Sequence, residues 1–175
     1  MRRAANYNTS GGTLKEGISY QFNHTWKMFC KMVKDFDDES WTKTGCGYIT
    51  PARISYHILG GTKYYIEDET VISFASGKKA DWNWENARNE DLPSKEDILE
   101  LIHMYKNKSD IWINQIDLEA DNAKFPWAGP TKLSVVLFQL RHMEYHIGEL
   151  NLLLHMSKDG NADDNWIKAF DDFIV

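Results

Sequence analysis

Two histidines four residues apart, His142 and His146, lie in the segment RHMEYHIGELN late in the chain. On an α-helix each residue turns by about 100°, so side chains four apart are separated by only about 40° and face the same side. The stripe that they share also contains Val135, Phe138 and Leu153, so it is expected to face the interior. Imidazoles at this spacing are a common way to hold one metal ion. The pair therefore indicates a metal site inside a helical core.

His57, in the segment ISYHILGG, is the best candidate for a third ligand. It lies about 10 Å from the beginning of its predicted helix, and His146 lies about 15 Å from the end of its own, at 1.5 Å per residue. If these two helices are antiparallel, the three imidazoles fall at a similar depth. Gly60 and Gly61 follow on the face of His57, and their missing side chains leave room for a metal, a water and a small ligand.

Three neutral ring nitrogens leave a coordination position open, which is the pattern of catalytic rather than structural sites. A metal ion there either acidifies a water bound at the open position or binds a thiolate or oxygen of a substrate in it. Glu149, three residues after His146 on the same face, is the candidate catalytic carboxylate: it either orients a histidine or accepts a proton. The alternative is a non-catalytic bundle in which the histidines are structural and the aromatic surface binds a partner or a second copy.

Two rival metal patterns are weaker. Glu100 and His103 form one Glu-x-x-His step of the kind found in di-iron bundles, but there is no second copy, and both residues lie off the apolar face. HMEYH is not the His-Glu-x-x-His of zinc proteases, because Glu144 points about 160° away from the histidines. We therefore expect Glu100 and His103 to form a solvated surface pair.

Composition excludes several classes of protein. The chain has 175 residues, the size of one domain, and a net charge of −6 with no basic block, which argues against nucleic acid or an anionic membrane as partner. No apolar run reaches the length of about 18 residues that a membrane span needs. Cys30 and Cys46 are too few for a disulfide framework, so a reduced, cytoplasmic protein is expected. Residues 1–12 are predicted to be a disordered polar tail before a single domain, residues 13–175.

Helical periodicity and capping signals predict an all-α four-helix bundle. The helices are expected at about 14–36, 51–74, 95–120 and 131–156, and no strand is predicted. Trp166, Phe170 and Phe173 are spaced for an additional short C-terminal helix. The connection at residues 75–93 is long enough to travel the length of a helix, at about 3.3 Å per extended residue. Helices two and three can then run parallel, in an up-down-down-up bundle. Trp82 and Trp84 in this crossover either roof the metal pocket or cover bundle surface.

The segments PARISYHILGG and RHMEYHIGELNLLL resemble those of the DinB/YfiT-like metalloenzyme family, over about residues 14–156. The resemblance implies an up-down-down-up bundle with a long crossover between helices two and three. It also implies a divalent metal, often zinc or nickel, held by His57, His142 and His146. Many members form homodimers, and a homodimer is expected here. Some relatives are S-transferases that use a low-molecular-weight thiol, and others resemble hydrolases or isomerases, so the resemblance implies a small-molecule substrate. Glu149 stands where many members carry glutamine.

Overall fold

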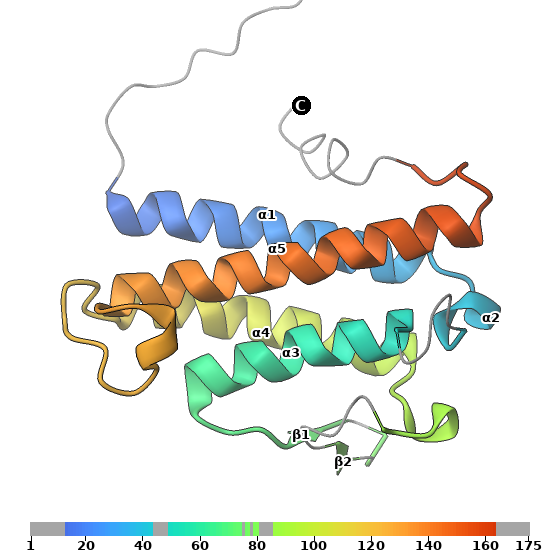
Figure 1. The fold of residues 1–175 in the computed structure, drawn as a ribbon, viewed down its shortest axis with the longest axis horizontal. Coiled ribbons are helices and arrows are strands. Elements are labelled where there is room, and N and C mark those ends of the chain that lie inside the picture. Colours follow the sequence, from blue (N-terminus) through green and yellow to red (C-terminus); the bar gives the residue numbers. More distant parts are fainter. Residues whose placement is uncertain (1–12, 44–48, 75, 78, 81–85, 164–175) are drawn as a thin grey trace, which may run out of the picture.

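Four long helices pack as a bundle in the computed structural model, which describes residues 13–43, 49–74, 76–77, 79–80 and 86–163 (Figure 1). They are α1 (Leu14–Asp35), α3 (Pro51–Glu67), α4 (Lys95–Gln115) and α5 (Lys132–Ser157). A short helix, α2 (Asp38–Trp41), follows α1 and was not predicted. The structure is mostly helical, as the sequence predicts. None of the described helices combines the length and the apolarity that a membrane span requires.

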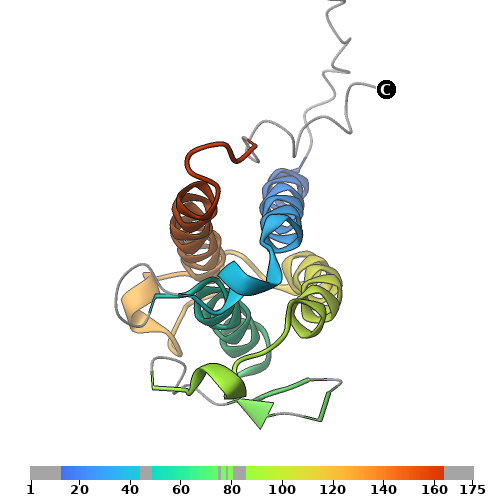
Figure 2. The same ribbon diagram turned by 90° about the vertical axis from the view of Figure 1, so that its right-hand side faces the viewer.

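The four long helices run in two opposite directions. In Figure 1, α3 and α4 both begin at the end of the bundle near α2 and run to the opposite end, while α1 and α5 run the other way. Viewed along the helices, α1 and α5 lie on one side of the bundle and α3 and α4 on the other (Figure 2). Helix α3 therefore packs against α5, which runs antiparallel to it, and against α4, which runs parallel to it.

Each long helix begins where a hydroxyl side chain accepts a hydrogen bond from a backbone N–H of the first turn. Such a cap contributes about 1 kcal/mol to helix stability. The four capping residues are Thr13, Thr50, Ser94 and Thr131. Because these caps set where each helix starts, they also set the height of every side chain along it.

Helix α3 ends earlier than the sequence predicts. It was expected to continue to Phe74, but Asp68 adopts a left-handed conformation with φ of 61°, and its N–H bonds to the carbonyl of Tyr64. The next residues are extended, and β1 (Ile72–Ser73) pairs antiparallel with β2 (Lys79–Ala80). The expectation of no strand was therefore wrong. The β-branched residues after Asp68 favour an extended backbone once the helix has stopped.

Helix α4 also stops before its predicted end at Ala120. Ile116 is extended, and the carbonyls of Leu118 and Ala120 instead accept hydrogen bonds from the N–H groups of Leu133 and Lys132. These contacts link the segment after α4 to the beginning of α5, and they compete with continued helix. Two 3-10 turns complete the described elements, η1 (Asn89–Asp91) before α4 and η2 (Pro126–Ala128) before α5.

The core lies between the four long helices and consists of aromatic and aliphatic side chains. Two polar contacts cross it: Nε1 of Trp26 on α1 donates to Oγ of Ser109 on α4 at 2.9 Å, and Nε2 of Gln139 on α5 donates to Oγ1 of Thr62 on α3 at 2.8 Å. The core includes Phe22, Phe29, Ile58, Leu59, Ile102, Tyr105, Met143 and Leu150. The predicted N-terminal tail, Cys46, Trp82, Trp84 and the predicted C-terminal helix lie outside the described residues.

Candidate metal centre

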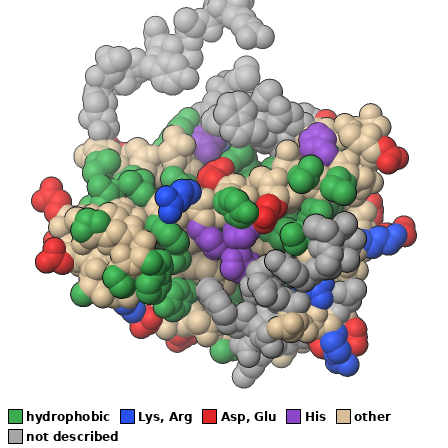
Figure 3. All heavy atoms as spheres, viewed as in Figure 1, with side chains coloured by type: hydrophobic (Ala, Val, Ile, Leu, Met, Phe, Trp, Pro, Cys, Tyr) green, Lys and Arg blue, Asp and Glu red, His purple; other side chains and the backbone are tan. Residues whose placement is uncertain are grey.

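The three histidines singled out by sequence lie together between α3 and α5. His57 comes from α3, and His142 and His146 come from α5; one ring nitrogen of each lies within 4.8 Å of the other two. Nε2 of His57 lies 3.0 Å from Nε2 of His142. Figure 3 shows histidine side chains gathered at the centre of one face, beside hydrophobic side chains. Within the described residues, this is the one group of three potential ligands that lie close enough to share an ion.

The spacing of the rings is compatible with a metal ion. Zinc–nitrogen bonds are about 2.0–2.1 Å, so two nitrogens on one ion lie about 3 Å apart. The three rings meet edge to face, with centroids separated by 4.5 to 4.9 Å. The contact between His57 and His142 is also compatible with a hydrogen bond, if one ring carries its proton on Nε2. The geometry therefore fits a metal site and a metal-free histidine cluster.

The protonation state of the cluster favours metal binding. Burial, together with the charges of His142 and His146, lowers the pKa of His57 to about 3. Burial, together with the charge of His146, lowers the pKa of His142 to about 4. Both rings are therefore neutral at neutral pH, and a metal need not displace a proton from their lone pairs.

The ring of His142 has a buried polar atom that makes no hydrogen bond to the described residues. Nδ1 of His142 is buried, and within the described chain it has no hydrogen-bond partner. Leaving such a group unpaired costs about 1–3 kcal/mol. Leucine at this position would avoid that cost, so packing alone does not explain the histidine. A functional role or a bound ion is one explanation for a buried group of this kind.

The two glycines near His57 have different roles. A Cβ on Gly61 would lie 2.7 Å from Cε1 and 3.1 Å from Nδ1 of His142, whereas a Cβ on Gly60 would meet nothing within 4 Å. The sequence predicted that both glycines leave room for a metal and its ligands. The space at Gly61 is instead filled by the ring of His142, so this glycine allows α3 and α5 to bring their histidines together.

Glu149 contacts one of the histidines directly. Its Oε2 lies 2.7 Å from Nδ1 of His146, and its side chain is about one-third exposed, at 31%. A carboxylate on Nδ1 holds the proton there and leaves the lone pair of Nε2 for the cluster. Of the two roles expected for Glu149, this contact favours orienting His146. Sequence reasoning missed Tyr145, whose ring stands edge-on to His146 with centroids 5.0 Å apart.

The remaining candidates lie away from this cluster. Glu100 and His103 are exposed on α4, as expected of a surface pair. The hydroxyl of Thr25 on α1 donates to Glu144, which is exposed. His24 is buried, at 4% exposure, and lies beside Tyr20, with ring centroids 4.5 Å apart.

Comparisons with protein-family models, with curated proteins and with solved structures found no match to this chain. The resemblance to the DinB/YfiT-like family therefore stays a prediction based on the two quoted segments.

Proposed function

We propose that this protein is a divalent-metal-dependent enzyme acting on a small molecule, with the ion held by His57, His142 and His146. The observation that carries the proposal is the convergence of three imidazoles, two of them with a depressed pKa, from two helices. The unpaired Nδ1 of His142 and the glycine beneath its ring add support, because neither improves packing. The acidic net charge favours a small molecule over a nucleic acid as substrate.

Zinc or nickel bound there would supply Lewis acidity and lower the pKa of a thiol or a water at an open coordination position. The protein's own residues prepare the site. Burial keeps His57 and His142 neutral, and Oε2 of Glu149 accepts the Nδ1 proton of His146 and fixes the orientation of that ring.

Thiol transfer to a small electrophile is the reaction class that we propose first, and hydrolysis second. The support is the resemblance of the two histidine segments to a family that contains S-transferases using low-molecular-weight thiols. Screening the metal-loaded protein for conjugation with several such thiols tests this class. Hydrolysis of a substrate in the absence of any thiol would favour the second class.

Metal analysis tests the site itself. We expect about one zinc or nickel ion per chain in the purified protein, and loss of most of it in His142→Ala. His103→Ala is the matched control, because His103 is exposed on α4 and lies outside the cluster. Equal metal content in the protein and in His142→Ala would contradict the proposal.

A non-catalytic bundle is the competing function, and the 3.0 Å contact between His57 and His142 favours it as a hydrogen bond in a metal-free core. This version predicts that a chelator changes neither the melting temperature nor any activity. A metal enzyme predicts loss of activity on chelation and its recovery when the ion is returned.

A further inference from the structure

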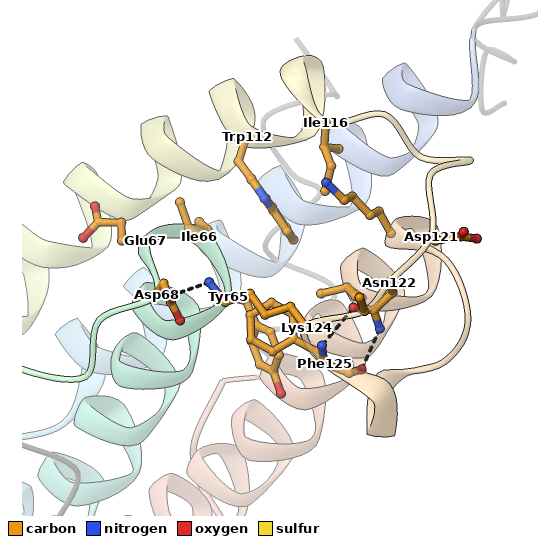
Figure 4. A pocket seen from close by; sticks show the side chains of 13 residues that line it. Tyr65, Ile66, Glu67, Asp68, Trp112, Ile116, Asp121, Asn122, Lys124 and Phe125 are labelled. Atoms are coloured by element: carbon orange, nitrogen blue, oxygen red, sulfur yellow. Dashed lines mark hydrogen bonds and ion pairs between the residues drawn. The ribbon is translucent and has the colours of Figure 1, made fainter.

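A cavity of about 370 Å³ lies at the end of the bundle where α3 and α4 stop (Figure 4). Both parallel helices end there, at Glu67 and Gln115, so neither fills the space beyond. The segment 116–131 covers it, and the first turns of α5 close its side. Its apolar walls are Tyr65, Ile66, Trp112, Ile116, Phe125 and Val135.

The cover of the cavity is held in one shape by hydrogen bonds. Nδ2 of Asn122 donates to the carbonyls of Phe125 at 2.6 Å and Gly129 at 2.7 Å, and its Oδ1 accepts from the N–H of Phe125 at 2.9 Å. Nε1 of Trp127 donates to the hydroxyl of Tyr65 at 3.1 Å. The aromatic walls are therefore in place before any ligand arrives, which lowers the entropic cost of binding.

The charged residues around the cavity are compensated or lie outside it. Glu67 forms ion pairs with Lys63 and Lys108, and Asp68 pairs with Lys124. The cavity is partly open to solvent, and Figure 4 shows the carboxylates of Glu67 and Asp121 directed away from its aromatic side chains. Lys132, the other lysine at the cavity, is exposed at the start of α5. Lys132 forms no ion pair among the described residues, but it is exposed and water screens its charge, so it compensates poorly for the hydration that a charged ligand would lose. The cavity therefore favours a neutral ligand.

We propose that this cavity binds an uncharged aromatic small molecule of one or two rings. Trp112 points from α4 toward Tyr65 and Phe125, and the rings of Tyr65 and Phe125 are 5.0 Å apart, so a flat ligand meets aromatic surface on several sides (Figure 4). A dry apolar cavity of about 150 Å³ holds benzene. The larger volume here admits a second ring, and the indole N–H of Trp112 supplies a donor for one polar substituent.

This site is separate from the histidine cluster. Tyr65 follows His57 by eight residues on α3, about 12 Å along the helix axis. The ring of Phe138, one turn before His142 on α5, packs against Tyr65 with centroids 5.7 Å apart and lies between the two sites. The proposal therefore does not depend on metal binding.

Titration of the metal-free protein with 2-naphthol, followed by ¹H–¹⁵N NMR, tests the proposal. We expect saturable shifts of the indole N–H signals of Trp112 and Trp127, caused by the ring current of the bound ligand. The matched probe is 2-naphthoate, which has the same rings and a negative charge. It should bind about tenfold more weakly or worse, a loss of about 1.4 kcal/mol.

Two tryptophan substitutions, one just after α4 and one on its exposed face, locate the bound probe. Ile116→Trp fills the cavity and should weaken 2-naphthol binding by about tenfold or more, while Ile111→Trp, at an exposed position of α4, should leave it unchanged. Val135→Phe is a second filling variant, should Ile116→Trp fail to fold. His57→Ala should bind 2-naphthol as tightly as the unmodified protein does. Absence of saturable shifts, equal binding of 2-naphthoate, or loss of binding in His57→Ala would each overturn the proposal.

Discussion

The backbone of Gly61 on α3 lies directly against the imidazole of His142 on α5, where a β-carbon would come within 2.7 Å of Cε1. Contacts between Cβ and ring atoms at this distance do not occur without movement. A methyl group at position 61 must therefore displace the His142 ring from its observed position. The glycine is thus part of the geometry of the cluster, although it offers no ligand atom.

Gly61→Ala should weaken zinc or nickel binding by about 10- to 100-fold, the range seen when residues that support metal ligands are changed. Gly60→Ala is the matched control on the neighbouring residue, because its Cβ would enter open space. It should leave the affinity unchanged and stabilise the helix by up to about 1 kcal/mol. Calorimetric titration of both variants with the metal checks this. Equal affinities would mean that the His142 ring does not need its observed position.

Substitutions of Glu149 separate its two expected roles. Glu149→Ala removes the acceptor of the Nδ1 proton of His146 and should reduce metal affinity about 10- to 100-fold. Glu149→Gln retains an amide oxygen as acceptor and should keep most of the affinity. If Glu149 also accepts a proton during turnover, Glu149→Gln will lower kcat while metal content stays normal. Unchanged kcat in Glu149→Gln would limit the residue to orienting His146.

Acid should destabilise the metal-free protein in a pH window set by His57 and His142, which are partly buried. Below about pH 6.5 the unfolded chain begins to protonate its histidines, whereas folded His57 and His142 do so only near pH 3 and 4. The unfolded state binds more protons in this interval, so the free energy of unfolding falls as pH falls, by up to about 1.4 kcal/mol per pH unit for each residue.

Urea unfolding between pH 7.5 and 5, with a chelator present, measures this slope before most carboxylates titrate. His57→Gln removes one of the two groups and should flatten the slope. An identical slope in His57→Gln would show that this imidazole is not the group that takes up the proton.

A partly buried ion-pair network joins α3 to α4 and should contribute to stability. Nζ of Lys63, a residue only 9% exposed, lies 2.6 Å from Oε2 of Glu67, which also pairs with Lys108. Burial would lower the pKa of Lys63, but hydrogen bonds to Glu67 and Glu69 raise it above its ordinary value. Glu67→Gln should therefore cost about 1–3 kcal/mol, because it leaves the buried Lys63 with only the exposed Glu69 as an anionic partner.

The exposed pair of Lys43 and Glu39 has the same four-residue spacing and provides the comparison. Glu39→Gln should change stability little, since water screens this pair. Chemical denaturation of both variants measures the difference. A loss in Glu67→Gln no larger than in Glu39→Gln would contradict a stabilising network.

The helix starts could be predicted because their causes are local. Two short patterns show this: Thr50 stands directly before Pro51, and Ser94 stands three residues before Asp97. Their hydrogen bonds involve only neighbouring residues. The predicted start of the helix that carries His57 and the predicted end of the helix that carries His146 allowed the depths of these residues to be compared, and the three rings do converge.

The ends of α3 and α4 could not be predicted in the same way because their causes are partly distant. The segment after Gln115 leaves the helix as it pairs with Lys132 and Leu133, far along the chain. Asp68 carries the signal of a left-handed end only weakly, since glycine is the usual residue there. Likewise, sequence placed Gly61 near the histidines but could not show that a ring from another helix rests on it.

The parallel packing of α3 against α4 has a consequence for how the chain folds. Two helices joined by a tight turn can meet as soon as both form, but α3 and α4 must wait until residues 68–94 have carried the chain back along the bundle. The entropy of closing that loop is lost before the helix contact compensates for it. We expect refolding to be slower than in a bundle of the same size with only antiparallel neighbours. Changes in this connection should therefore alter the speed of assembly more than the affinity of the histidines for an ion.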